Sequence, residues 1–165
     1  MMGASGGFPI DLVLFGMIAA FLVLRLRAVD ANFAPDSFLN GAEAAFRMIV
    51  AAYAAGDRVA LRPLLSDETY AAFEGAITAR EQAGESQRTE IREIPEARID
   101  DAALRGGLAS ISVAFTSDQV NLTLDRDGKE VAGTDAVTEI HDIWTFERDL
   151  GSPDPTWRLV AARSA

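Results

Sequence analysis

The sequence contains no cysteine and only one histidine, His141. Without cysteine the chain has no disulfide, no thiolate nucleophile and no thiolate metal ligand, a composition that suits a reducing compartment. One histidine cannot form a multi-histidine metal site within a single chain. The sequence also has no glycine-rich phosphate loop, no GxSxG nucleophile elbow between a strand and a helix, and no HExxH motif. We therefore expect neither a metal nor another cofactor.

Basic residues are scarce as well: 15 Lys and Arg stand against 25 Asp and Glu, and the formal net charge is −10. Asp11, Arg25 and Arg27 precede residue 30, so residues 30–165 hold 24 acidic and 13 basic residues, a net charge of about −11. Such a surface repels phosphate backbones and gains nothing from counterion release. Nucleic acid is therefore not an expected partner.

A long apolar run is present at the N-terminal end, from Phe8 to Leu26 (FPIDLVLFGMIAAFLVLRL). As a helix, these residues would extend about 28 Å, close to the roughly 30 Å hydrocarbon core of a bilayer. The part without any charged or strongly polar side chain, Leu12 to Leu24, is shorter and also fits a buried helix, an interfacial helix or a signal peptide. The positions expected inside the bilayer are Phe8, Leu12, Phe15, Ile18, Phe21 and Leu24.

The flanks of this run favour a membrane anchor. A secretory signal needs basic residues before the run, whereas here Arg25 and Arg27 follow it. Because positive charges near a span stay in the cytoplasm, we predict a single-pass membrane protein with its N-terminus on the outer side and the residues from about Val29 onward in the cytoplasm. Asp11 lies near the outer end, where its carboxylate can reach water.

Gly16 and Ala20 form a small-xxx-small pair that would let another membrane helix approach closely. The expected partners are therefore membrane lipids and other membrane proteins. We expect an anchor over residues 1–29, a short linker over 30–37 and one domain over 38–165. Eight extended residues reach about 28 Å at most, so the domain would lie against the membrane surface.

Residues 36–85 show the 3.6-residue period of amphipathic helices. The first expected helix runs from Asp36 to a stop at Gly56, and Asp57 would cap a short second helix that Pro63 interrupts. Ser66 would cap a third helix, which ends near Gly84. The pattern predicts three helices in succession.

After residue 85 the period changes to two, which is typical of strands. The alternating segments are residues 89–94, 108–115, 120–124, 137–148 and 157–161. Gly106-Gly107 and Asp127-Gly128 mark turns between strands. Helices followed by antiparallel strands predict an α+β domain, with the helices on one face of a curved sheet.

The order of these segments resembles the Tim44-like family over nearly all of residues 38–160. The most specific part is the closing sequence DIWTFERDLGSPDPTWRLV, from Asp142 to Val160, and Gly56-Asp57 and Leu64-Leu65 add to it. The resemblance implies a nuclear transport factor 2-like (cystatin-like) cone, with three helices across a curved antiparallel sheet of about four strands. The family's mitochondrial member tethers the protein-import motor to the inner membrane, and the family has bacterial relatives. The resemblance therefore implies a scaffold role at the bacterial inner membrane, with other inner-membrane proteins as partners and, given the orientation above, the N-terminus in the periplasm. Bacterial relatives usually have a longer polar linker, so either this linker is short or a segment is absent from this sequence.

Seven aromatic residues could fill this cone or line an open pocket in it: Phe46, Tyr53, Tyr70, Phe73, Trp144, Phe146 and Trp157. A filled cone is the simpler interpretation, because aromatic side chains supply much of a buried core. An open cone would accept an acyl chain or a partner's apolar side chain.

No catalytic residue is expected. His141 would need a polar pocket and a positioned proton donor to act as a base, and the adjacent Asp142 should point to the opposite face of its strand. Two functions remain: a non-enzymatic, membrane-anchored adaptor or accessory subunit, for example in protein translocation or complex assembly, and a lipid- or small-molecule-binding domain. A buried carboxylate beside Tyr53, Tyr70 or His141 would favour small-molecule chemistry, and a wholly apolar open cone would favour lipid or peptide binding.

Overall fold

The computed structural model describes residues 24, 26–27 and 33–165. The expected span therefore lies almost wholly outside the described residues, and so do Asp11, Arg25, Gly16 and Ala20. Within the described part of the chain, no helix is long and apolar enough to cross a membrane. The membrane anchor accordingly remains a prediction from the sequence.

Within residues 33–165, three α-helices and one short 3-10 helix precede the sheet. They are α2 (Pro35–Ala55), α3 (Arg58–Leu61), the 3-10 helix η1 (Arg62–Leu64) and α4 (Asp67–Gln82). The side chain of Asp57 accepts a hydrogen bond from the backbone N–H of Ala60 (3.0 Å), and Ser66 caps α4 through the N–H of Thr69 (3.2 Å). Both predicted caps are confirmed, because each satisfies an N–H that has no partner within its own helix.

The sheet consists of β1 (Ser86–Arg105), β2 (Leu108–Leu124), β3 (Glu130–Asp149) and β4 (Arg158–Ser164). Its order is β1-β2-β3-β4, with every neighbouring pair antiparallel. The α+β class and the four-stranded antiparallel sheet are thus confirmed. Gly106 and Gly107, at φ 57° and 84°, form the tight turn between β1 and β2, a conformation that glycine adopts without strain.

The strands are longer than their sequence pattern indicates. Alternation predicts a strand over residues 89–94, whereas β1 runs for 20 residues and changes register at three places. Each such irregularity reverses which residues point inward, so the second half of β1 looks like a polar loop. Residues 108–115 and 120–124, expected as separate segments, are parts of one strand, β2.

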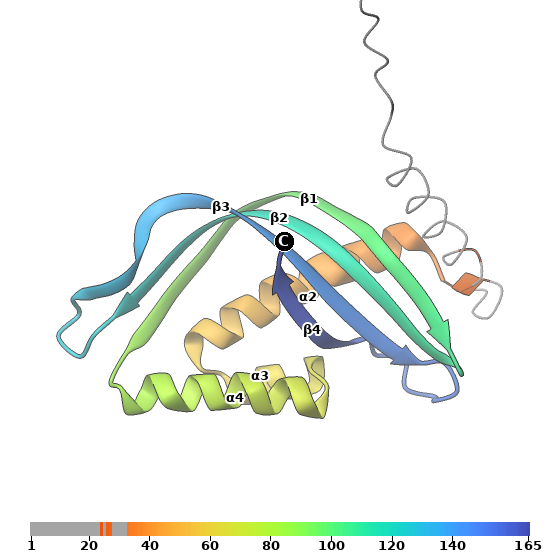
Figure 1. Cartoon of the computed structure of the whole chain (residues 1–165), viewed down its shortest axis with the longest axis horizontal. Coiled ribbons are helices and arrows are strands. Elements are labelled where there is room, and N and C mark those ends of the chain that lie inside the picture. The colour runs from red at the N-terminus through yellow and green to blue at the C-terminus, as the bar shows by residue number, and fades with distance from the viewer. Residues whose placement is uncertain (1–23, 25, 28–32) are drawn as a thin grey trace, which may run out of the picture.

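The sheet is strongly arched, and α2 crosses its concave face while α4 lies along its open side (Figure 1). One cause of the curvature is an irregularity between β2 and β3, where the register shifts between Gln119 and Asn121. Gly133 sits at φ 80° beside it, and a Cβ there would collide with the carbonyl oxygen of Asn121. Only glycine allows the two strands to approach so closely.

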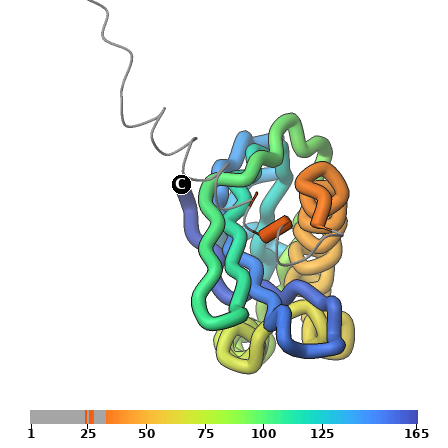
Figure 2. The backbone as a smooth tube through the Cα atoms, turned by 90° about the vertical axis from the view of Figure 1, so that its right-hand side faces the viewer, coloured from red at the N-terminus to blue at the C-terminus, as the bar shows by residue number. Residues whose placement is uncertain are grey.

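The core lies between the concave face and α2, and Figure 2 shows the strands and α2 as two layers. Strand β2 contributes Ala109, Ile111, Val113 and Phe115, all fully buried, as its alternation predicts. Helix α2 contributes Phe46 and Ile49, which are also fully buried.

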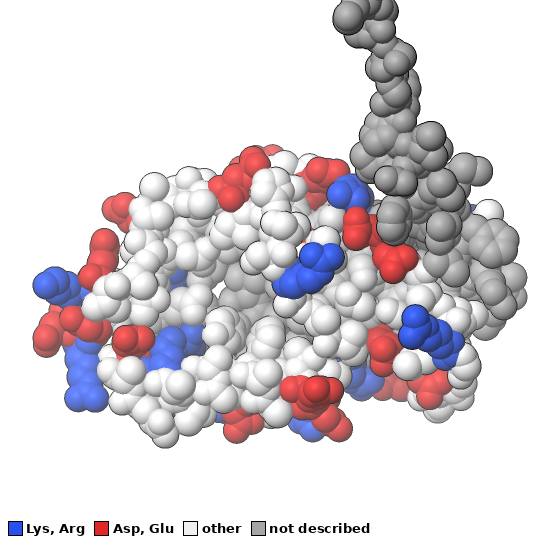
Figure 3. All heavy atoms as spheres, in the orientation of Figure 1, with Lys and Arg blue, Asp and Glu red and all other residues white. Residues whose placement is uncertain are grey.

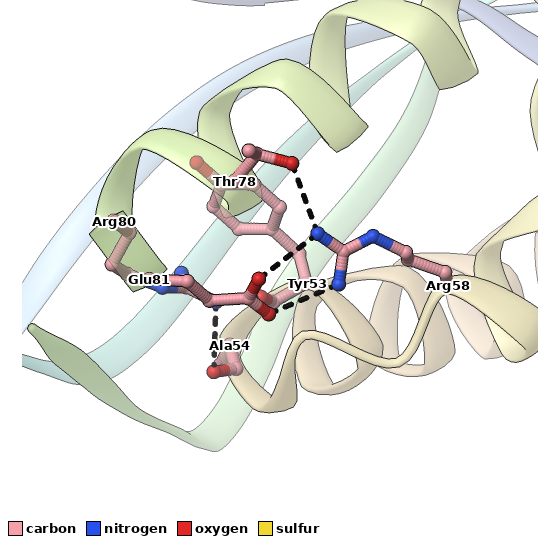
Figure 4. Close-up of polar contacts among 6 residues, drawn as sticks. All are labelled: Tyr53, Ala54, Arg58, Thr78, Arg80 and Glu81. Carbon is pink, nitrogen blue, oxygen red and sulfur yellow. Dashed lines mark hydrogen bonds and ion pairs between the residues drawn. The ribbon is translucent and has the colours of Figure 1, made fainter. Parts of the chain in front are cut away.

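Two arginines tie helix α4 to the end of α2 and the start of α3 (Figure 4). Arg58 donates to both carboxylate oxygens of Glu81, at 3.0 and 3.1 Å, and to the hydroxyl of Thr78 at 3.0 Å. Arg80 donates to the carbonyl oxygens of Tyr53 (2.7 Å) and Ala54 (3.2 Å). These contacts hold α4 along the open side of the arched sheet.

Candidate functional site

The end of the apolar run already belongs to the domain core. Leu26, the last residue of the run, is 2% exposed and packs in the hydrophobic core, two positions after Leu24, the last position expected inside the bilayer. The Nε of Arg27 donates to the carbonyl oxygen of Phe33 at 3.1 Å, and Phe33 is itself buried. Two residues expected in the anchor, and one expected in the linker, therefore contact the folded domain.

An apolar groove of about 410 Å³ opens beside this junction, along the first half of α2. Its lining residues are Phe33, Ala34, Ser37, Phe38, Gly41, Ala42, Ala45, Phe146, Arg148 and Trp157. The ring of Phe38 is at its centre, with centroids 5.0 Å from Trp157 and 6.2 Å from Phe146 in edge-on geometry. Such pairs hold their rings in fixed positions, so the groove has a preformed aromatic wall.

The middle of the cone is filled. Phe46, which is 0% exposed, lies with its ring centroid 4.5 Å from the rings of both Phe115 and Trp144. On α2 it stands between the residues that line the groove and those that line a second cavity. The cone is thus divided into two spaces of different character.

The second space, here called the polar cavity, has a volume of about 270 Å³. Its lining residues are Ile49, Val50, Tyr53, Phe73, Gln87, Thr89, Gln119, Asn121, Ile140, Asp142 and Trp144. They come from α2, α4 and the inner faces of β1, β2 and β3. The molecular surface in Figure 3 is hollowed between α4 and the arch of the sheet, with charged side chains mostly around its rim.

Asp142 is the carboxylate of the polar cavity and is half-buried. Burial raises its pKa above the ordinary value, and the neighbouring charge of His141 offsets part of that rise. Among the described residues, none donates a hydrogen bond to the Asp142 carboxylate or forms an ion pair with it. A half-buried carboxylate in a cavity with a raised pKa is a feature of ligand-binding and catalytic sites.

His141 does not contribute to either cavity. Its Nε2 lies 2.8 Å from Glu139 Oε1, and its Nδ1 lies 3.2 Å from Thr116 Oγ1, on the outer face of the sheet. The expectation that His141 and Asp142 face opposite ways agrees with this placement. The two side chains therefore do not form a catalytic pair.

The structure distributes the seven aromatic candidates over several places. Phe146 and Trp157 line the apolar groove, Tyr53, Phe73 and Trp144 line the polar cavity, and Phe46 lies between the two spaces. Tyr70 lines neither space, and the guanidinium of Arg62 lies over its ring, 4.7 Å from the centroid.

The sequence interpretation missed the polar residues of the cavity. Ser117, Gln119 and Asn121 continue the inward set that ends at Phe115, two residues apart each time, so strand periodicity was a usable signal. Gln87 and Thr89 could not be found this way, because their inward direction depends on the pairing of β1 with β2.

Comparison with known families decides the classification. The profile of the Tim44-like domain matches residues 20–164. The chain belongs to the Tim44-like domain family. The match begins inside the apolar run and includes Leu26, in agreement with the burial of that residue in the domain core.

Solved structures also resemble this Tim44-like domain. The intermembrane space region of the chloroplast protein ARC6 superposes with a TM-score of 0.55 at 8% identity, covering 76% of this chain and 95% of that one. A conserved protein from Planctomyces limnophilus DSM 3776 gives a TM-score of 0.38 at 17% identity, covering 77% and 92%. No curated protein sequence matches the chain. The likeness to ARC6 shows that the two share a fold.

Proposed function

We propose that this Tim44-like chain is a membrane-anchored, non-enzymatic adaptor that holds an acidic domain at the cytoplasmic face of the bacterial inner membrane. The observation that carries the proposal is the burial in the domain core of Leu26, the last residue of the apolar run. It stands two positions after Leu24, the last position expected inside the bilayer. Two residues of helix advance only about 3 Å. A domain attached so closely lies at the bilayer surface.

The apolar groove is the contact site in this proposal. It is beside the point of attachment, since Phe33 belongs both to the groove and to the core cluster that contains Leu26. Exposed apolar grooves are typical of sites that bind an apolar segment of a partner. We propose another inner-membrane protein as that partner, with a role in protein translocation or complex assembly. Membrane lipids contact the anchor.

Site-specific crosslinking tests this function. A photo-crosslinking amino acid replaces Ser37, an exposed residue of the groove, in the full chain expressed near its natural level. The matched control carries it at Met48, which is exposed on α2 outside the groove. We expect an inner-membrane protein to crosslink to position 37 and not to position 48. Recovery of a lone monomer after mild detergent extraction, with no crosslink at position 37, would rule the adaptor out.

A second candidate function is lipid binding in the same groove. The groove's volume of about 410 Å³ and its aromatic lining favour it. Native mass spectrometry of the detergent-extracted chain would then detect one bound phospholipid. Replacing Gly41, which lines the groove and has nothing within 4 Å of an added Cβ, by Leu should displace that lipid. A lipid that survives Gly41→Leu would not be in the groove.

A further inference from the structure

The polar cavity has an unbroken line of hydrogen bonds along one wall. It starts at Arg80 on α4 and ends at Ser117 on β2. The bonds run from Arg80 to Gln87 (2.7 Å), Gln87 to Thr89 (3.0 Å), Thr89 to Asn121 (2.8 Å), Asn121 to Gln119 (3.1 Å) and Gln119 to Ser117 (2.8 Å). Gln119 is only 5% exposed, so this wall is a built, buried feature.

Arg80 sets the direction of the whole line. A guanidinium can only donate, so Gln87 must turn its oxygen toward Arg80 and its amide nitrogen toward Thr89. The hydroxyl of Thr89 then accepts from Gln87 and donates to the oxygen of Asn121. The same logic orients Asn121 and Gln119.

This direction decides what the wall offers to a ligand. Each amide oxygen accepts from the residue before it, and each amide nitrogen has two hydrogens, of which the line uses one. Gln87, Asn121 and Gln119 therefore each keep one N–H. The wall formed by β1 and β2 thus has one N–H to spare on each amide, beside amide oxygens that each keep one lone pair. Its spare N–H donors suit an acceptor such as a carbonyl oxygen.

The next strand of the sheet, β3, has the complementary character. Its Asp142 lines the same cavity, and an ionised carboxylate can only accept hydrogen bonds. Trp144 lines the cavity two positions further along β3, and an aromatic face attracts organic cations, whereas the ring of Tyr53 already has the guanidinium of Arg80 5.2 Å from its centroid. The net charge of the domain also draws cations toward the site.

We propose that the polar cavity binds a small amino compound that also carries a carbonyl group, with its ammonium at Asp142 and its carbonyl oxygen on the amide wall. The size is suitable, because a dry cavity of about 150 Å³ is enough for benzene and this cavity measures about 270 Å³. An apolar body of the ligand would contact Phe73 and Ile49. The site is separate from the apolar groove, so a failure to bind this ligand would leave the proposed adaptor function unaffected.

Three matched probes test the ligand class. Phenylalaninamide has the ammonium, the carbonyl and an aromatic body; 3-phenylpropionamide lacks only the ammonium; phenethylamine lacks only the carboxamide. The full chain has two tryptophans, so Trp157→Phe leaves Trp144, in the cavity wall, as the only emitter. Each probe is added in steps near neutral pH while the Trp144 emission is followed. Phenylalaninamide should bind at least about tenfold more tightly than either other probe, because a hydrogen bond to a charged group contributes strongly.

Two variants locate the binding. Asp142→Asn keeps the shape and removes the charge, so phenylalaninamide should fall to the affinity of 3-phenylpropionamide. Asp118→Asn makes the same chemical change on the outer face of β2 and should leave all three affinities unchanged. Equal affinities for the three probes, no binding by any of them, or an ammonium preference that survives Asp142→Asn would overturn the proposal.

Discussion

Phe46 and Trp144 contact each other across the centre of the cone, with ring centroids 4.5 Å apart and ring planes tilted by 48°. Their contact joins α2 to β3 and divides the interior into an apolar groove and a polar cavity. Each space therefore has its own chemistry, and each can be altered without the other.

Phe46→Ala should destabilise the domain by about 3–5 kcal/mol, the usual cost of deleting a buried phenylalanine. Phe46 is fully buried, and its ring also contacts Phe115. Chemical denaturation of the full chain in detergent measures the loss. Met48→Ala, at an exposed position of the same helix, should change stability by no more than about 0.5 kcal/mol. Similar losses in the two variants would show that Phe46 is not the central contact.

Gly133→Ala should destabilise the sheet by more than Gly128→Ala. Both glycines have positive φ, at 80° and 77°, so both substitutions incur the left-handed strain of about 1–2 kcal/mol. A Cβ at Gly133 also collides with the carbonyl oxygen of Asn121, whereas nothing lies within 4 Å of one at Gly128. The free energies of unfolding of the two variants give the comparison. Equal losses would mean that β2 and β3 do not approach closely at this point.

Asp154→Asn should make the protein less sensitive to acid. Hydrogen bonds from Thr156, together with the ion pair to Arg158, lower the pKa of Asp154 from 3.8 to about 2. A lowered folded-state pKa gives stability that is present above pH 3.8 and is lost as the pH falls toward 2. The melting temperature should therefore fall less steeply between pH 5 and pH 2 in the variant than in the unchanged protein. If the melting temperatures of the two proteins changed equally with pH, the lowered pKa of Asp154 would be contradicted.

Arg58→Ala should loosen α4 only slightly, and the effect should shrink in high salt. The pair with Glu81 is well aligned, but both side chains are partly exposed, so water and ions screen it. Melting temperatures of Arg58→Ala and Glu81→Gln at low and high ionic strength measure this. A salt-independent loss would indicate that the hydrogen bond from Arg58 to Thr78 matters more than the charge.

Much of this fold could be predicted from the sequence, because local rules agree with the tertiary structure in most segments. Asp57 and Ser66 cap the N-termini of α3 and α4, as their positions in the sequence predict. The alternation of β2 identifies Ile111 and Phe115 as core residues. The length of β1 could not be predicted, since its register changes mask the alternation.

The two spaces inside the cone were harder to foresee. The aromatic residues were recognised, but whether they fill or line the cone depends on where α2 crosses the sheet. The hydrogen bond from Thr89 to Asn121 joins residues that are 32 positions apart. No local pattern reveals such a contact, and the amide wall exists only because β1 pairs with β2 in that register.

The most direct test of a domain held at the bilayer surface is fluorescence quenching by lipid headgroups. Trp144→Phe leaves Trp157, in the groove, as the only tryptophan, and Trp157→Phe leaves Trp144 in the deeper cavity wall. Each full-chain variant is placed in nanodiscs with or without headgroup spin-labelled lipid. We expect the spin label to quench Trp157 clearly and Trp144 much less. Emission from Trp157 that does not respond to the labelled lipid would contradict a domain positioned against the membrane.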